Sequence, residues 1–128
     1  MSIDAVNTPA FQPVSEQVHF SQAVKSGGFV FCSGATGAGP DGKVPKDLKE
    51  EFRNAFESVK TVLAEAGASL SDVVEMTTYH VDMDDTMRTF WGIREEFMSA
   101  PWCAWSAIGI TSLSGGAKVE IRAIAKLP

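Results

Sequence analysis

The pattern of apolar and polar residues along this chain predicts two amphipathic helices. Between residues 46 and 67, apolar side chains recur at steps of three and four, which places them on one face of a helix. This stripe consists of Leu48, Phe52, Phe56, Val59 and Leu63. Asp47 is suited to cap the first turn, and Gly67 stands where a helix commonly ends in a left-handed residue.

A second helix is expected over residues 84–99. Phe90, Ile93 and Phe97 fall on one side of it, and Asp84 or Asp85 is expected as its N-cap.

Strand-like segments surround the two helices. They lie at residues 18–34 (two short strands around a Gly-containing turn), 72–81, 105–110 and 118–125. The linking residues 111–117 have the composition of a hairpin loop. The order is β-β-α-β-α-β-β. One mixed sheet with both helices on one face buries both stripes most simply, so we expect an α+β fold. A single domain should span residues 1–128, with 1–16 as an irregular N-terminal arm.

The last strand predicts which residues lie on the face that the helices leave open. Val119, Ile121, Ala123 and Ala125 share the covered face, and Glu120 and Arg122 take the other. Trp105 alternates with Ile108 and Ile110, so we expect it beside Glu120 and Arg122 on the open face. An indole there is a poor choice for a monomer, which indicates an oligomer with a polar and aromatic cleft between subunits.

Composition and charge narrow the function classes. The 128 residues are 45% hydrophobic and 21% charged, as in an ordinary globular domain, and the net charge of -5 disfavours nucleic acid as a partner. No signal peptide or membrane span is predicted, and we expect a cytoplasmic protein. Cys32 and Cys103 lack metal-like or CxxC spacing, so reduced cysteines are expected.

Three motifs have alternative interpretations. Glu120 and Arg122 could be a general base beside a carboxylate-binding cation, but spacing alone favours a salt bridge on an exposed strand. Residues 80–85, with His80 and three aspartates, could bind a metal, although a strand end followed by an acidic helix start is favoured. The Gly-rich residues 34–43 lack the Gly-Lys-Ser/Thr of a phosphate loop, which favours a surface loop.

Four segments together resemble one known family. "HFSQAVKSGGFVFCSG", "AEAGASLSDVV", "MTTYHVDM" and "KVEIRAIA" are similar in order and spacing to the Rid family, the YjgF-type reactive-intermediate deaminases, from about residue 18 to 126. The resemblance implies a chorismate-mutase-like fold and a homotrimer whose sheets form a central barrel. It also implies a small-molecule cleft at each subunit interface, and no metal or organic cofactor.

The resemblance implies hydrolysis of imines or enamines of amino acids, with an arginine holding the substrate carboxylate and a glutamate acting on water. The glutamate matches Glu120. The arginine falls on Trp105, which has neither the charge nor the bidentate donor. The family's tyrosine falls on Phe20 and its helix asparagine on Phe90. The predicted catalytic residue is Glu120, and the predicted substrate-binding residues are Trp105, Phe20, Ser33, Gly34, Phe90, Arg122 and Ala107.

These substitutions make the predicted cleft more apolar. We therefore expect a divergent deaminase whose substrate is larger or less anionic than a simple 2-imino acid, with Arg122 as a possible replacement for the missing cation. The alternative is a non-catalytic binding or regulatory trimer. Ribonuclease or translation-inhibitor activity is disfavoured by the charge.

Overall fold

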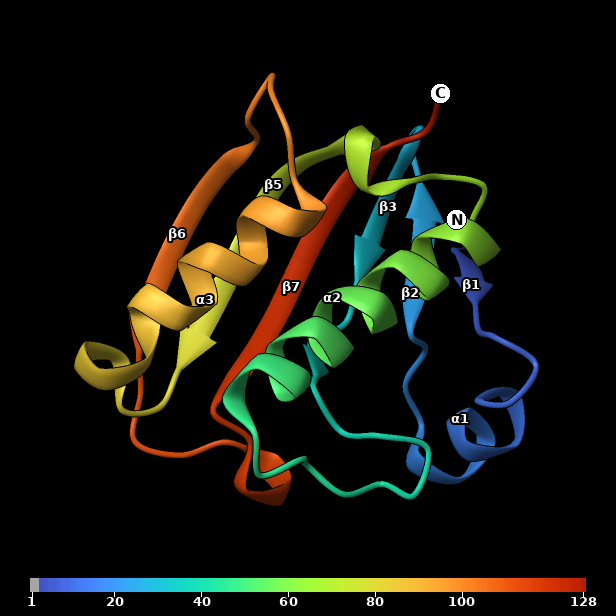
Figure 1. Ribbon diagram of the computed structural model, residues 1–128. Helices are drawn as coiled ribbons and strands as arrows, with labels where there is room; N and C mark the ends of the chain where they lie inside the picture. Colours follow the sequence, from blue (N-terminus) through green and yellow to red (C-terminus); the bar gives the residue numbers. More distant parts are fainter. Residues whose placement is uncertain (1–2) are drawn as a thin grey trace.

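The computed structural model describes residues 3–128 (Figure 1). Within that range the chain forms three α-helices and a seven-stranded sheet. The helices are α1 (Gln12–Val18), α2 (Leu48–Glu65) and α3 (Met83–Phe97). The strands are β1 (Asp4–Val6), β2 (Ala23–Ser26), β3 (Phe29–Cys32), β4 (Ala35–Thr36), β5 (Val73–His80), β6 (Ala104–Gly109) and β7 (Val119–Lys126). Short 3-10 turns at Leu70–Asp72 and Ser114–Gly116 precede β5 and β7.

The sheet is mixed and has the order β1-β2-β3-β7-β5-β6, with β4 also paired to β7. Only β5 and β6 are parallel, joined by α3; the other pairs are antiparallel. Figure 1 shows α2 and α3 side by side across one face. This confirms the predicted α+β, chorismate-mutase-like fold with one mixed sheet and the two long helices on one face.

The stripe of α2 forms the centre of the core, as its spacing predicts. Phe52, Phe56 and Leu63 are fully buried, and the Asp47 carboxylate accepts a hydrogen bond from the Glu50 N–H at 3.0 Å. Gly67 adopts φ 87°, a left-handed conformation in which any other residue would be strained. The predicted cap and stop of this helix are therefore confirmed.

The start of α3 differs from the prediction. Its N-cap is Asp82, in the left-handed region at φ 55°, and neither Asp84 nor Asp85 takes that place. The Asp82 side chain makes no capping bond and instead forms an ion pair with Lys118. Asp84 and Asp85 lie in the first turn, where negative charge is favourable to the helix dipole.

The segment 1–16 is not irregular over its described residues. β1 pairs with β2 at the edge of the sheet, and α1 begins at Gln12 with Pro13 in its first turn. Three-residue strands and two-turn helices leave little periodicity in a sequence, so composition alone suggests a loop here.

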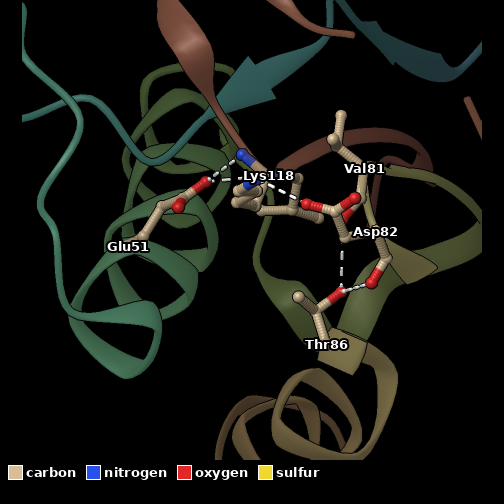
Figure 2. Close-up of polar contacts among 6 residues, drawn as sticks. Glu51, Val81, Asp82, Thr86 and Lys118 are labelled. Atoms are coloured by element: carbon tan, nitrogen blue, oxygen red, sulfur yellow. Dashed lines mark hydrogen bonds and ion pairs between the residues drawn. The ribbon is translucent and has the colours of Figure 1, made fainter. Parts of the chain in front are cut away.

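Residues 111–117 do not close a hairpin, because β7 does not pair with β6. They cross from the sheet edge to its centre, where β7 lies between β3 and β5. A carboxylate from α2 fixes the beginning of β7: Glu51 Oε2 accepts from the Lys118 N–H at 2.7 Å and the Val119 N–H at 3.2 Å. Figure 2 shows this contact beside the Lys118–Asp82 ion pair, so α2, β7 and the start of α3 meet at one point.

Candidate functional site

Glu120 lies on the open face of the sheet, against the backbone of Gly34. It is half-buried and stands opposite Thr36 of β4 and Tyr79 of β5. An ideal Cβ added to Gly34 would lie 2.5 Å from the carboxyl carbon of Glu120 and 2.6 Å from its Oε2. Only glycine leaves the carboxyl group this space, so two residues of the predicted site are in direct proximity.

Ser33 and Phe20 lie near this pair, beside a groove. The Ser33 hydroxyl donates to the Ser21 carbonyl at 2.6 Å, and this bond ties the segment around Phe20 to the end of β3. Phe20 is 49% exposed and packs on Phe11 with ring centroids 5.4 Å apart. Both residues and Gly34 line a groove of about 810 Å³ between α1, α2 and the loop after β4. The groove thus gathers Phe20, Ser33 and Gly34, and Glu120 adjoins it only through Gly34.

Trp105 lies on the other face of the sheet, and its predicted position beside Glu120 and Arg122 is wrong. β6 runs parallel to β5 with Trp105 level with Met76, whose side chain is buried under the helices. The indole Nε1 donates to the Thr78 hydroxyl at 2.9 Å, and the ring packs at 4.9 Å from that of Trp91 on α3. The other side of β6 carries Ile108, which is 42% exposed.

Phe90 belongs to the core and is not exposed to any cleft. Its relative exposure is 0%, and its ring packs against those of Phe52, Phe56 and His80. The helix stripe that the sequence predicts for Phe90 is confirmed. Its predicted contact with substrate would require α3 to move, because the neighbouring rings cover it in this structure.

The remaining predicted residues lie apart from one another. Ala107 is exposed on β6 and points to the same face as Trp105. Arg122 is exposed on β7 and shares the open face with Glu120. The predicted salt bridge between Glu120 and Arg122 does not form: the ion pairs among residues 3–128 are Arg53–Glu96 and Lys118–Asp82. The glutamate therefore has no cationic side chain as a partner here.

The predicted residues thus form two separate groups in one chain. Glu120 and Gly34 lie where β4 meets β7, whereas Trp105 and Ala107 lie on edge strand β6. Glu120 on β7 is two strand spacings from β6, about 10 Å, and the two groups lie on opposite faces of the sheet. A small ligand cannot touch both groups of the same chain.

A buried polar chain runs beneath Trp105. The Thr78 hydroxyl, which accepts from the indole, lies 2.6 Å from Nε2 of His80. His80 is fully buried, and burial lowers its pKa to about 4, so the ring is neutral near pH 7. Its Nδ1 has no hydrogen-bond partner within residues 3–128.

Arg94 is a buried residue that the sequence prediction missed. It is 5% exposed in the last turn of α3, and its guanidinium carbon lies 4.4 Å from the ring centroid of Trp105 and 5.4 Å from that of Trp102. We call these residues and Trp91 the arginine–tryptophan cluster. A signal was present in the sequence: Arg94 follows Phe90 by four positions, which places a charge on the apolar stripe of the helix.

Neither a metal site nor a membrane-spanning helix emerges from residues 3–128. No three His, Cys, Asp or Glu side chains in that range gather closely enough to hold a metal ion. His80 points into the core, away from the exposed aspartates of the α3 start. No helix in the described part of the chain is long and apolar enough to cross a bilayer. Both cysteines are free, and burial raises the pKa of the Cys32 thiol to about 11.

Known proteins match almost the whole chain. The family model described as Endoribonuclease L-PSP matches residues 12–127. The RutC family protein YjgH of Escherichia coli (strain K12) is 34% identical over 110 residues, which cover 85% of this chain and 83% of that protein. The 2-iminobutanoate/2-iminopropanoate deaminase of Dermatophagoides farinae is 32% identical over 122 residues, 93% of this chain and 92% of that protein. A solved structure of protein YjgH superimposes with a TM-score of 0.90 at 29% identity, covering 100% of this chain and 98% of that one.

Proposed function

The chain belongs to the Rid (YjgF-type) family, and on that premise we propose that it hydrolyses the C=N bond of an imine, or of its enamine tautomer, derived from an amino acid. The family's deaminase-like role is shared by curated relatives, one of which is named for 2-iminobutanoate and 2-iminopropanoate. The observation that carries the proposal is the Glu120 carboxyl group held against Gly34, with no cation of residues 3–128 paired to it.

The reaction needs a group that moves protons between water and nitrogen. Glu120 accepts a proton from a water molecule as the water oxygen bonds to the C=N carbon, and its carboxyl group then gives this proton to the nitrogen. The hydroxyl proton of the tetrahedral intermediate passes through Glu120 to the nitrogen as the C–N bond breaks, and ammonia leaves together with a 2-oxo product. Every bond and proton in this sequence is accounted for by water and one carboxylate, so no cofactor is part of the proposal.

The proposed cleft lies between subunits of a homotrimer. One chain keeps Trp105 and Ala107 on the β6 edge, two strand spacings (about 10 Å) from Glu120 and on the opposite face of the sheet. The β6 edge of one copy set beside the groove at Phe20 of the next would bring both groups to one ligand. Exposed apolar side chains near both regions, including Phe20, Trp102 and Ile108, support an interface there.

The test is ammonia release from 2-iminobutanoate generated in situ. We expect Glu120→Gln to lower the rate by about 10²- to 10⁴-fold, the usual contribution of a positioned acid–base group. Glu75→Gln is the matched control, because Glu75 is an exposed carboxylate of the same sheet on β5. An unchanged rate in Glu120→Gln contradicts the assigned role.

A non-catalytic binding trimer is the second candidate function. It is favoured by the apolar side chains at positions 20 and 105, where the resemblance implies polar ones. A wild-type protein that binds 2-oxo acids but accelerates no imine hydrolysis would support this role.

The charge of the substrate depends on what replaces the family's arginine. Trp105 by itself argues for a substrate larger or less anionic than a simple 2-imino acid. Arg122 lies on the opposite face of the sheet from Trp105 and cannot take over the position directly. The guanidinium that does lie at Trp105 belongs to Arg94.

A further inference from the structure

Arg94 is held in place by two aromatic rings. Its guanidinium carbon lies 4.4 Å from the centroid of Trp105 and 5.4 Å from that of Trp102. Cation–π contacts at these distances stabilise a guanidinium and fix the plane of its donor fork. Arg94 also lies in the last turn of α3, where the helix dipole favours a positive charge.

The charge of Arg94 is nevertheless uncompensated. It takes part in neither ion pair formed among residues 3–128, and its Nε has no hydrogen-bond partner. Buried guanidinium groups are normally paired with an anion, because removal of the charge from water is costly. A residue that is 95% covered, aromatic on two sides and without a counter-ion has the features of an anion site.

We propose that Arg94 binds the carboxylate of the substrate, and that it supplies from α3 the guanidinium that position 105 lacks. This inference rests on the proposed function for the identity of the substrate, but not for the presence of the anion site. A single guanidinium with no second cation against it matches one carboxylate, which its planar fork can bind through two hydrogen bonds.

The arrangement assigns Trp105 a supporting task. Its ring packs against the Arg94 guanidinium, and its indole N–H donates a hydrogen bond to the Thr78 hydroxyl. This bond fixes the orientation of the ring. Trp102, 53% exposed, also packs on the guanidinium, with its ring centroid 5.4 Å from the guanidinium carbon. The substrate is therefore a small carboxylate, in contrast to the less anionic substrate that Trp105 alone suggests.

Binding of 2-oxobutanoate, the hydrolysis product of 2-iminobutanoate, tests the site without turnover. Quenching of tryptophan fluorescence or calorimetry would report the dissociation constant. We expect Arg94→Gln to weaken binding about 10- to 150-fold, as for loss of a charge-assisted pair, and Arg94→Lys to restore part of it. The amide of 2-oxobutanoate should bind the wild type and Arg94→Gln equally.

Two further variants separate alternative sources of binding. Arg88→Gln, an exposed arginine on the same helix, should leave the affinity unchanged. A large loss in Arg122→Gln with none in Arg94→Gln would overturn the proposal in favour of the open face. Equal weakening of the amide would also overturn it, because the carboxylate would then play no part.

The anion could instead come from a neighbouring subunit. Light scattering of wild type and Arg94→Gln distinguishes this source: an oligomer that dissociates on substitution would assign Arg94 to an ion pair between subunits and overturn the proposal. An unchanged oligomer with weakened 2-oxobutanoate binding supports it. Should Arg94-dependent binding persist without any ammonia release from 2-iminobutanoate, the anion site stands and the proposed deaminase function fails.

Discussion

The carboxyl group of Glu120 lies where a side chain at position 34 would have to be, 2.5 Å from an ideal Cβ on Gly34. This contact makes the position of Glu120 depend on a residue with no side chain. Any larger residue at 34 forces the carboxylate or the loop before β4 to move.

We expect Gly34→Ala to reduce stability by about 1–3 kcal/mol, the usual cost of overpacking. In a Glu120→Ala background most of that cost should disappear, because the clashing carboxyl group is gone. Urea unfolding of the wild type, both single variants and the double variant measures this coupling. Additive effects would show that the strain arises elsewhere.

Glu51 accepts two hydrogen bonds from backbone N–H groups at the start of β7. Glu51→Gln keeps an acceptor for the Lys118 and Val119 N–H groups, whereas Glu51→Ala leaves both without one. We expect about 1–3 kcal/mol or more of destabilisation in Glu51→Ala and little in Glu51→Gln at pH 7. Equal losses in the two variants would indicate that packing, and not hydrogen bonding, fixes the start of β7.

The same carboxyl group should affect the pH dependence of stability. Burial raises the pKa of Glu51, so the folded protein retains a proton that the unfolded chain releases above pH 4.5. The free energy of unfolding therefore falls as pH rises from 4.5 through the higher folded pKa. Urea titrations at pH 4.5 and 7 should show that stability rises more, or falls less, with pH in Glu51→Gln than in the wild type.

The lowered pKa of His80 has the opposite effect on the pH dependence of stability. Its pKa is lowered from 6.5 to about 4, so between these values the unfolded chain binds a proton that the folded protein does not. Stability contributed by neutral His80 is present above pH 6.5 and is lost as pH falls towards 4; about 2 kcal/mol should be lost between pH 7 and 5. Comparison of wild type with His80→Gln at both pH values isolates this contribution. The same pH difference in both proteins would contradict it.

Trp105→Arg tests the arginine–tryptophan cluster. A second guanidinium would lie close to that of Arg94, with a repulsion of about 1–4 kcal/mol at 4 Å, and the Thr78 hydroxyl would lose its donor. We expect lower thermal stability than in Trp105→Leu, which lacks the added charge. Arg94→Met should restore much of the loss in Trp105→Arg and none in Trp105→Leu.

Some elements were predictable because their apolar patterns repeat over many residues. The stripe of α2, its Asp47 cap and the alternation of Val119, Glu120 and Ile121 follow directly from spacing. The proximity of Glu120 to Gly34 was implied by the resemblance to the Rid family, and not by spacing.

The position of Trp105 could not be predicted from alternation. Period-two alternation places Trp105 and Ile108 on opposite faces of the strand. Both faces carry apolar residues, so the pattern does not indicate which one the helices cover. In β6 the apolar Ile108 is exposed, and the indole is the buried side, because β6 is an edge strand that only α3 covers. Phe90 was assigned both to the helix stripe and to the ligand site, and packing allows only the first. Arg94 was overlooked because its lack of a counter-ion is visible only in three dimensions.

The place of β7 has a consequence for how the chain acquires its structure. β7 follows every other strand in sequence, yet it lies between β3 and β5 and joins the two halves of the sheet. A chain growing from its N-terminus completes β1–β3 and the β5–α3–β6 unit before the strand that links them exists. Contacts between residues far apart in sequence then form last, which slows folding and leaves strand edges exposed in the meantime. Substitutions in β7 should therefore affect the yield of folded protein during synthesis more than equally buried substitutions in α2.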